Sequence, residues 1–169
     1  MHHVAVSILL AIALTVPCGE ASAQKVEPLS LEIVVPTGWT RLASTNPQFI
    51  SLFSPDQKIR VTVYATKSDA IDEETLEQRA QLTNSKVLEA QSRIAKASGA
   101  VVVDQTSTTT RVGQAWHAET TTIWSNGFST RGVTIFQRGR QLSVGSESRA
   151  ATQSELAKAV QDVMAGVKQ

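Results

Sequence analysis

His117 and Glu119 are the residues whose types and spacing come nearest to acid–base chemistry in this sequence. They lie two positions apart in a segment rich in threonine and aromatic residues, which is typical of a β-strand, so both side chains would point to one face of a sheet. A histidine beside a carboxylate can act as a general base, but it also needs a group that orients it, and the sequence singles out none. We therefore expect a structural role for this pair and keep a hydrolase-like enzyme that uses His117 and Glu119 as the alternative.

Metal and cofactor sites are not indicated by the sequence. Outside residues 1–23, His117 is the single histidine and cysteine is absent, so a zinc site would need an unusual set of carboxylate ligands. The acidic run Asp72–Glu74 could attract calcium, but it lies where a helix N-terminus favours negative charge. The chain contains no G-x-S-x-G, P-loop or G-x-G-x-x-G motif. The sequence thus predicts a protein without enzymatic activity, metal or cofactor.

Two features of the sequence could carry binding. Arg138 and Arg140 flank a glycine turn, where they would form a basic patch for an acidic partner or anionic lipid, or serve as exposed turn residues that protect a sheet edge. Trp124 and Phe128 flank Asn126–Gly127, where exposed aromatic side chains would favour a protein contact and buried ones would belong to the core. The candidate partner-binding residues are therefore Trp124, Phe128, Arg138 and Arg140.

The segment from Gln114 to Ser148 predicts three consecutive antiparallel strands. Asn126–Gly127 is a strong hairpin signal, and Arg138–Gly139 marks the next turn. If both are two-residue turns, alternation places an apolar set on one common buried face: Trp116, Ala118, Val133, Ile135, Leu142 and Val144. A three-residue turn with a bulge at Gly139 is the alternative for the second hairpin.

Hydrophobic periodicity predicts the remaining elements. Residues 31–35 and 101–110 read as strands, and residues 49–53 and 59–66 as a hairpin, whereas the polar residues 24–30 predict a loop. Apolar residues spaced three and four apart predict a helix that begins at Asp72–Glu74 and ends at a glycine, Gly99.

A second helix and the fold class follow from the end of the chain. Thr152 and Glu155 have capping-box spacing, and an apolar stripe continues from there to Val167. The weak helix formers at residues 83–85 could split the first helix into two. The predicted fold class is α+β, an antiparallel β-sheet flanked by two amphipathic helices.

The beginning of the chain predicts export. Residues 4–16 are apolar, Pro17 follows, and Ala21–Ala23 has the small-x-small form of a signal-peptidase site. The apolar run is shorter than the about 20 residues that span a bilayer, so we expect no stable membrane anchor after cleavage. Pro17 in front of Cys18 disfavours a lipoprotein signal. We therefore predict a signal peptide at residues 1–23 and a single domain at residues 24–169.

Composition points to the bacterial periplasm and away from nucleic acids. An exported domain without cysteine must be stabilised by its core and suits that compartment. The formal net charge of +1 becomes +2 without residues 1–23, because these contain Glu20 and neither Lys nor Arg. A nearly neutral chain lacks the basic surface that holds nucleic acid.

The order of elements resembles the PsbP/Mog/DcrB-like superfamily. Val35–Trp39 resembles the P-x-G-W entry of that superfamily, Thr75–Glu77 resembles the T-L-E start of its helix, and Gly113–Trp116 resembles its glycine-led strand. The resemblance covers Ile33 to Val167. It implies an α/β/α-type sandwich around an antiparallel sheet, and it implies non-catalytic binding or assembly assistance, because members include extrinsic subunits of photosystem II, a Ran-binding nuclear protein and exported bacterial proteins. No residue role is carried over from it.

Three functional hypotheses remain open at this stage. The first is an exported, non-enzymatic binding or assembly-assisting protein of the bacterial periplasm with a protein partner. The second is the hydrolase-like enzyme, and the third is an immunity or inhibitor protein against a secreted effector.

Overall fold

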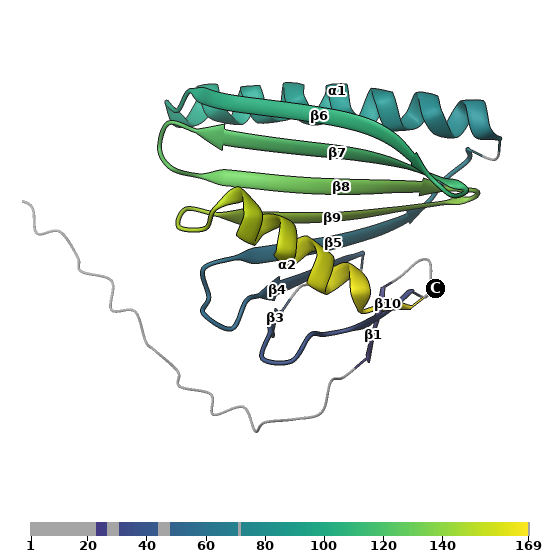
Figure 1. Ribbon diagram of the computed structural model, residues 1–169, viewed down its shortest axis with the longest axis horizontal. Coiled ribbons are helices and arrows are strands. Elements are labelled where there is room, and N and C mark those ends of the chain that lie inside the picture. The colour runs from purple at the N-terminus through teal and green to yellow at the C-terminus, as the bar shows by residue number, and fades with distance from the viewer. Residues whose placement is uncertain (1–22, 27–30, 44–47, 71, 169) are drawn as a thin grey trace, which may run out of the picture.

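The chain forms one large antiparallel sheet with a helix on each face, and a small second sheet (Figure 1). The computed structural model describes residues 23–26, 31–43, 48–70 and 72–168. The large sheet has seven strands in the order β3-β4-β5-β9-β8-β7-β6, and the small one has the order β1-β2-β10. The strands are β1 (Ala23–Val26), β2 (Leu31–Val34), β3 (Thr40–Leu42), β4 (Phe49–Phe53), β5 (Arg60–Lys67), β6 (Val102–Val112), β7 (Ala115–Trp124), β8 (Ser129–Gln137), β9 (Arg140–Ser148) and β10 (Val167–Lys168).

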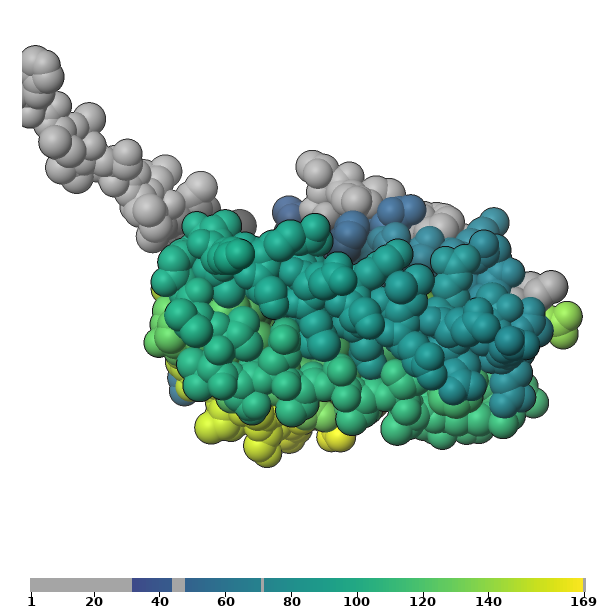
Figure 2. Space-filling view, turned by 90° about the horizontal axis from the view of Figure 1, so that it is seen from above, coloured from purple at the N-terminus to yellow at the C-terminus, as the bar shows by residue number. Residues whose placement is uncertain are grey.

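The two helices cover different halves of the large sheet. Helix α1 (Glu73–Ser98) packs on β6, β7 and β8, and helix α2 (Gln153–Ala165) packs on β9, β8 and β5 from the other side. Figure 2 shows the yellow residues of α2 protruding on the side opposite to α1. We call these two sides the α1 face and the α2 face. The predicted α+β class with two flanking helices is confirmed.

The apolar core is divided between the two faces. On the α2 face Val61 and Val63 of β5 pack with Leu156 and Val160 of α2 and are almost completely buried. On the α1 face a smaller cluster gathers around the buried ring of Phe136. Each face carries buried apolar residues, since successive strand residues point to opposite sides of the sheet. The members of the smaller cluster are Ala70, Leu76, Ala80, Ala118 and Phe136, with Trp116 packed against them.

The predicted register of the hairpin between β7 and β8 is wrong by one residue. Ala118 lies opposite Thr134, not opposite Ile135. The turn has three residues: only Gly127 takes a left-handed φ of 78°, and the Trp124 amide bonds the Phe128 carbonyl. A one-residue slip sends every side chain of a strand to the other face. The predicted common face therefore separates: Trp116 and Ala118 lie on the α1 face, whereas Val133, Ile135, Leu142 and Val144 lie on the α2 face.

The hairpin between β8 and β9 has the predicted register. Gln137 pairs with Arg140 across a two-residue turn, and Ile135 lies opposite Leu142. Gly139 supplies the left-handed φ of 75° that this turn needs, while Arg138 does not have a positive φ. The glycine therefore removes the strain that an arginine would meet at a left-handed position.

Helix α1 is continuous and begins and ends where the sequence indicates. The Asp72 carboxylate accepts a hydrogen bond from the Thr75 amide at 2.7 Å, which is an N-cap, and Gly99 ends the helix in the left-handed region. The weak helix formers at residues 83–85 do not split it. One of them, Asn84, is buried, and its amide nitrogen donates to the Thr108 carbonyl of β6 at 2.8 Å. Tertiary contacts thus override a local preference.

The ends of the domain differ from the sequence-based expectation. Gln24–Val26 lies in β1 and not in a loop, because it pairs with β2. Helix α2 stops at Ala165, and Val167 pairs with Ile33 as part of β10 instead of continuing the helix. The short strand β3 was not predicted. The predicted signal peptide lies outside the described residues except for Ala23, and neither helix in the described part of the chain has the length and apolarity needed to cross a bilayer.

Replacing Leu156 by alanine should strongly destabilise the domain. Leu156 is 0% exposed and fills the core under α2, so Leu156→Ala should lower the free energy of unfolding by about 2–5 kcal/mol. Leu82 is 48% exposed on α1, and Leu82→Ala is the matched control, with a change within about 0.5 kcal/mol. Urea unfolding followed by circular dichroism measures both; equal effects would contradict the assigned core.

The capping box of α2 should make stability depend on acidity. Hydrogen bonds from the Thr152 backbone and hydroxyl lower the pKa of Glu155. A lowered folded-state pKa stabilises the fold above the pKa of the unfolded chain, and this contribution is lost as the pH falls through the folded-state value. Glu155→Gln should therefore lose less stability than the wild type between pH 7 and pH 3. Urea midpoints at the two pH values measure this, and parallel losses would contradict it.

Candidate functional site

The α1 face of the large sheet is open over β9, β5 and β4, because α1 packs mainly on β6, β7 and β8. The side chains on this open half are mostly polar and half-buried or exposed. We call it the open half of the α1 face. It carries Phe49, Ser51 and Phe53 of β4, Arg60, Thr62, Tyr64 and Thr66 of β5, and Gln141, Ser143, Gly145 and Glu147 of β9.

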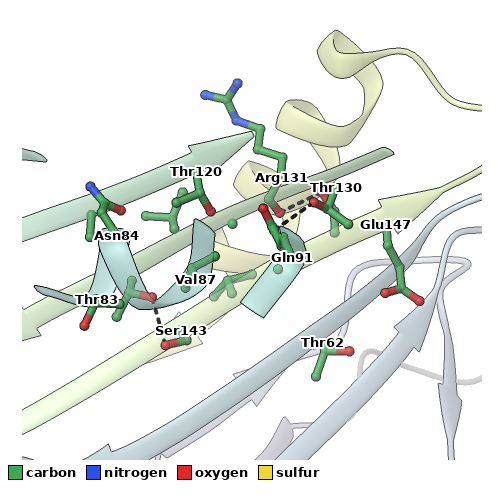
Figure 3. A pocket seen from close by; sticks show the side chains of 17 residues that line it. Thr62, Thr83, Asn84, Val87, Gln91, Thr120, Thr130, Arg131, Ser143 and Glu147 are labelled. Carbon is green, nitrogen blue, oxygen red and sulfur yellow. Dashed lines mark hydrogen bonds between the residues drawn. The ribbon is translucent and has the colours of Figure 1, made fainter. Parts of the chain in front are cut away.

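A cavity of about 210 Å³ lies where α1 meets this open half (Figure 3). Helix α1 forms one wall, the backbone and side chains of β7, β8 and β9 form the floor, and Thr62 and Glu147 lie on the side away from the helix. Threonine is the most frequent residue in the lining, which also has apolar groups such as Val87 and Ala118. Its residues include Thr83, Asn84, Val87 and Gln91 of α1, and Thr120, Thr130, Gly132, Thr134, Ser143 and Gly145 of the sheet.

Hydrogen bonds fix the α1 wall of this cavity. Gln91 donates to the Thr130 hydroxyl at 3.2 Å, and its carbonyl accepts from the Gln105 amide at 3.1 Å and from the Thr122 hydroxyl. Asn84 uses its amide nitrogen for β6, where the Thr109 hydroxyl accepts at 3.0 Å. The helix is therefore held to the sheet by polar contacts at the cavity itself.

A stacked aromatic pair lies on the open half beside the cavity. The ring centroids of Phe49 and Tyr64 are 4.7 Å apart with planes at 26°, and Phe49 is 36% exposed. On the same face Arg60 forms an ion pair with Glu147, the residue directly opposite it on β9. The open half thus combines two stacked aromatic rings with an ion pair that has no net charge.

His117 and Glu119 lie on the α2 face, away from the cavity under α1. They line a separate hollow of about 190 Å³ beside α2. Burial lowers the pKa of His117, and the nearby Glu119 carboxylate opposes this shift. The Arg131 guanidinium donates to the Glu119 carboxylate at 3.1 Å, so within the described residues Glu119 is paired with Arg131 and does not orient His117. At neutral pH this leaves an uncharged imidazole beside an ion pair.

The four predicted partner-binding residues do not come together. Trp124 and Phe128 lie at the β7–β8 turn, and Arg138 and Arg140 lie at the β8–β9 turn, at the opposite end of these strands. Trp124 is 5% exposed and packs on Phe128 with ring centroids 5.2 Å apart. The Arg140 guanidinium donates to the Gln137 side chain at 2.6 Å, while Arg138 is exposed.

Sequence reasoning missed the open half and the cavity. One signal for the open half was present: Tyr64 is an aromatic residue on the otherwise polar side of the alternating strand β5. Another was a glycine in the interior of each of two neighbouring strands, Gly132 in β8 and Gly145 in β9. Neither signal says which residues of α1 lie above them.

The chain has a PsbP-like fold, in which a helix packs on each face of an antiparallel sheet. This is the fold that the resemblance of the sequence implies. The structure of this chain is similar to the solution structure of cyanobacterial PsbP (CyanoP) from Synechocystis, with a TM-score of 0.56 and 12% sequence identity. The match covers 93% of this chain and 98% of the CyanoP chain. A crystal structure from Bacteroides thetaiotaomicron matches with a TM-score of 0.46 and 8% identity over 88% of this chain and 48% of that one. No protein-family model and no curated protein matches the sequence.

Titration should place the pKa of His117 below its usual value of 6.5, because burial disfavours the charged imidazole. Glu119→Gln should lower this pKa further, since the carboxylate favours the imidazolium. NMR titration of the His117 ring protons measures both values. A wild-type pKa above 6.5, or one that rises in the Glu119→Gln variant, would contradict this description of the hollow.

Proposed function

We propose that this protein is an exported, non-enzymatic binding or assembly-assisting protein of the bacterial periplasm that holds a protein partner on the open half of its α1 face. The observation that carries this proposal is the stacked pair of Phe49 and Tyr64 on a sheet surface that α1 leaves uncovered. Tyrosine, phenylalanine and arginine are enriched in protein interfaces, and tyrosine and arginine are frequent among the few residues that carry most of the binding energy. The open half carries these three residue types on one face, with Arg60 four residues before Tyr64 on β5 and opposite Phe53 of β4.

The backbone under this surface supports a binding role. Strand β5 is hydrogen-bonded on both sides, to β4 and to β9. Tyr64 and Arg60 therefore project from a fixed support, and little conformational entropy of the main chain is lost when a partner binds. A surface of this kind favours recognition of a folded partner.

Export is supported by the sequence of the first 23 residues and by the absence of cysteine from the rest of the chain. A non-enzymatic role is supported by the surroundings of His117. Its neighbour Glu119 is engaged by Arg131, so the arrangement lacks the oriented base on which the hydrolase hypothesis depends.

Replacing Tyr64 should weaken the proposed contact. Affinity capture of the mature protein from periplasmic extract should return a reproducible protein partner, and Tyr64→Ala should reduce its affinity at least tenfold, equivalent to about 1.4 kcal/mol. His117→Ala, on the opposite face, is the control and should retain the partner. Circular dichroism should show that both variants are folded.

Two outcomes would contradict the proposal. One is a partner that binds wild type and Tyr64→Ala equally well. The other is capture of a small molecule with no macromolecule, which would make the protein a small-ligand carrier instead.

A further inference from the structure

Two glycines face each other in the floor of the cavity under α1. Gly132 of β8 lies directly opposite Gly145 of β9, and the next residues along the same row of the sheet are Thr120 on one side and Thr62 on the other. The row continues to Ser107 on β6. Two neighbouring strands thus present bare backbone at the same point, below the edge of α1.

The protein's own structure does not require glycine at either position. Neither residue is among those with a positive φ. A Cβ atom on Gly145 would meet only the Arg131 carbonyl oxygen at 3.9 Å, and one on Gly132 would meet only the Thr120 hydroxyl oxygen at 3.4 Å. Glycine is disfavoured inside strands because it loses more backbone freedom on folding than other residues and packs nothing. A strand glycine without an internal reason is typical of a place where a ligand approaches the backbone closely.

Most polar side chains around the bare floor are neutral hydrogen-bonding groups. Hydroxyls of threonine and serine both donate and accept, so they suit a ligand that does the same. Glu147 is paired with Arg60, and the Arg131 guanidinium is bonded to Glu119 on the other face, which leaves the lining without net charge. The hydroxyls belong to Thr62, Thr83, Thr120, Thr130, Thr134 and Ser143.

An unpartnered acceptor lies in the wall of the same cavity. Asn84 is 6% exposed, and its amide nitrogen turns towards β6 to donate to Thr108 and Thr109. The carbonyl oxygen of that planar amide faces the cavity side and accepts no hydrogen bond within the described residues. A buried acceptor is satisfied in most proteins, so this oxygen calls for a donor that reaches the back of the cavity.

The size of the cavity limits the ligand. Its volume is about 210 Å³. It is smaller than the about 300–1,000 Å³ of sites for drug-sized ligands. A single sugar ring has this scale, many hydroxyls, and a flat C–H face that can lie on bare backbone with Val87 and Ala118 beside it.

We propose that the hollow over Gly132 and Gly145 binds one neutral sugar ring, alone or as the end of a glycan. The glycines let the ring approach the strands, the threonine and serine hydroxyls bond its edge, and a ring hydroxyl donates to the Asn84 carbonyl oxygen. This site is separate from the proposed protein contact at Phe49 and Tyr64, although the two lie side by side on the α1 face.

The test titrates the isotope-labelled protein with D-glucose and with N-acetylglucosamine and follows backbone amide signals by NMR. At least one sugar should shift the amide signals of Gly132 and Gly145 in a saturable way. Inorganic phosphate should not shift them, because the lining has no unpaired positive side chain. Gly145→Val fills the hollow and should weaken sugar binding at least tenfold, with an unfolding midpoint at or above that of the wild type. Ser107→Val adds the same kind of bulk at an exposed position of the same row and should bind as the wild type does.

Several results would overturn the inference. These are saturable shifts with phosphate, no shifts with either sugar at concentrations up to solubility, sugar binding that survives Gly145→Val, or a Gly145→Val variant that is less stable, since this would give the glycine a structural role. The outcome is distinguishable from that of the proposed function. Loss of sugar binding in Gly145→Val with the protein partner retained supports both, whereas a partner lost on Tyr64→Ala without any sugar binding leaves only the proposed function standing.

Discussion

The structure depends on a difference in width: the seven-stranded sheet is much wider than either helix that packs on it. Neighbouring strands lie about 4.8 Å apart, so seven strands span about 30 Å, whereas a helix with its side chains is about 10–12 Å across. One helix can therefore cover only part of a face. The chain places α1 over β6 to β8 and α2 over β5, β8 and β9, so that β8 is the strand both helices share. The part of the α1 face that α1 leaves uncovered is mostly polar, and it carries hydroxyls, an ion pair and two aromatic rings.

The different positions of the two helices on the sheet explain which parts of the fold could be predicted from sequence. Helices and most strands follow from local periodicity and caps, as at Asp72 and Thr152, because those signals lie within a few residues of each other. It was harder to predict to which face of the sheet each strand residue points, because this depends on the length of the turn between β7 and β8. Asn126 does not take a positive φ, and its side-chain oxygen accepts a hydrogen bond from the Phe128 amide, so the loop has three residues and the apolar set divides between two cores. Alternation alone cannot reveal this, since a strand buried on both faces has apolar residues on each.

The candidate site could be predicted much less well than the fold. Its lining comes from α1 and from four strands spread from Thr62 to Glu147, so no segment of the sequence contains it. Tyr64 and the glycines at 132 and 145 are unusual for their strands, but each is a single residue whose meaning depends on what lies across the sheet. His117 attracted attention because histidine has chemistry of its own. The structure instead gives it a half-buried position beside the Glu119–Arg131 ion pair.

The way α1 is attached connects the cavity to the stability of the helix. Few of its side chains are buried apolar groups, and Asn84 and Gln91 hold it to the sheet through hydrogen bonds to β6, β7 and β8. Polar contacts contribute about 0.5–1.5 kcal/mol each and depend on geometry more strongly than apolar packing does. The same two residues line the cavity, so a ligand that bonds the Asn84 carbonyl oxygen would add to the contacts that hold α1 in place. Binding in the cavity and the position of α1 beside the open half of its face would then be energetically coupled.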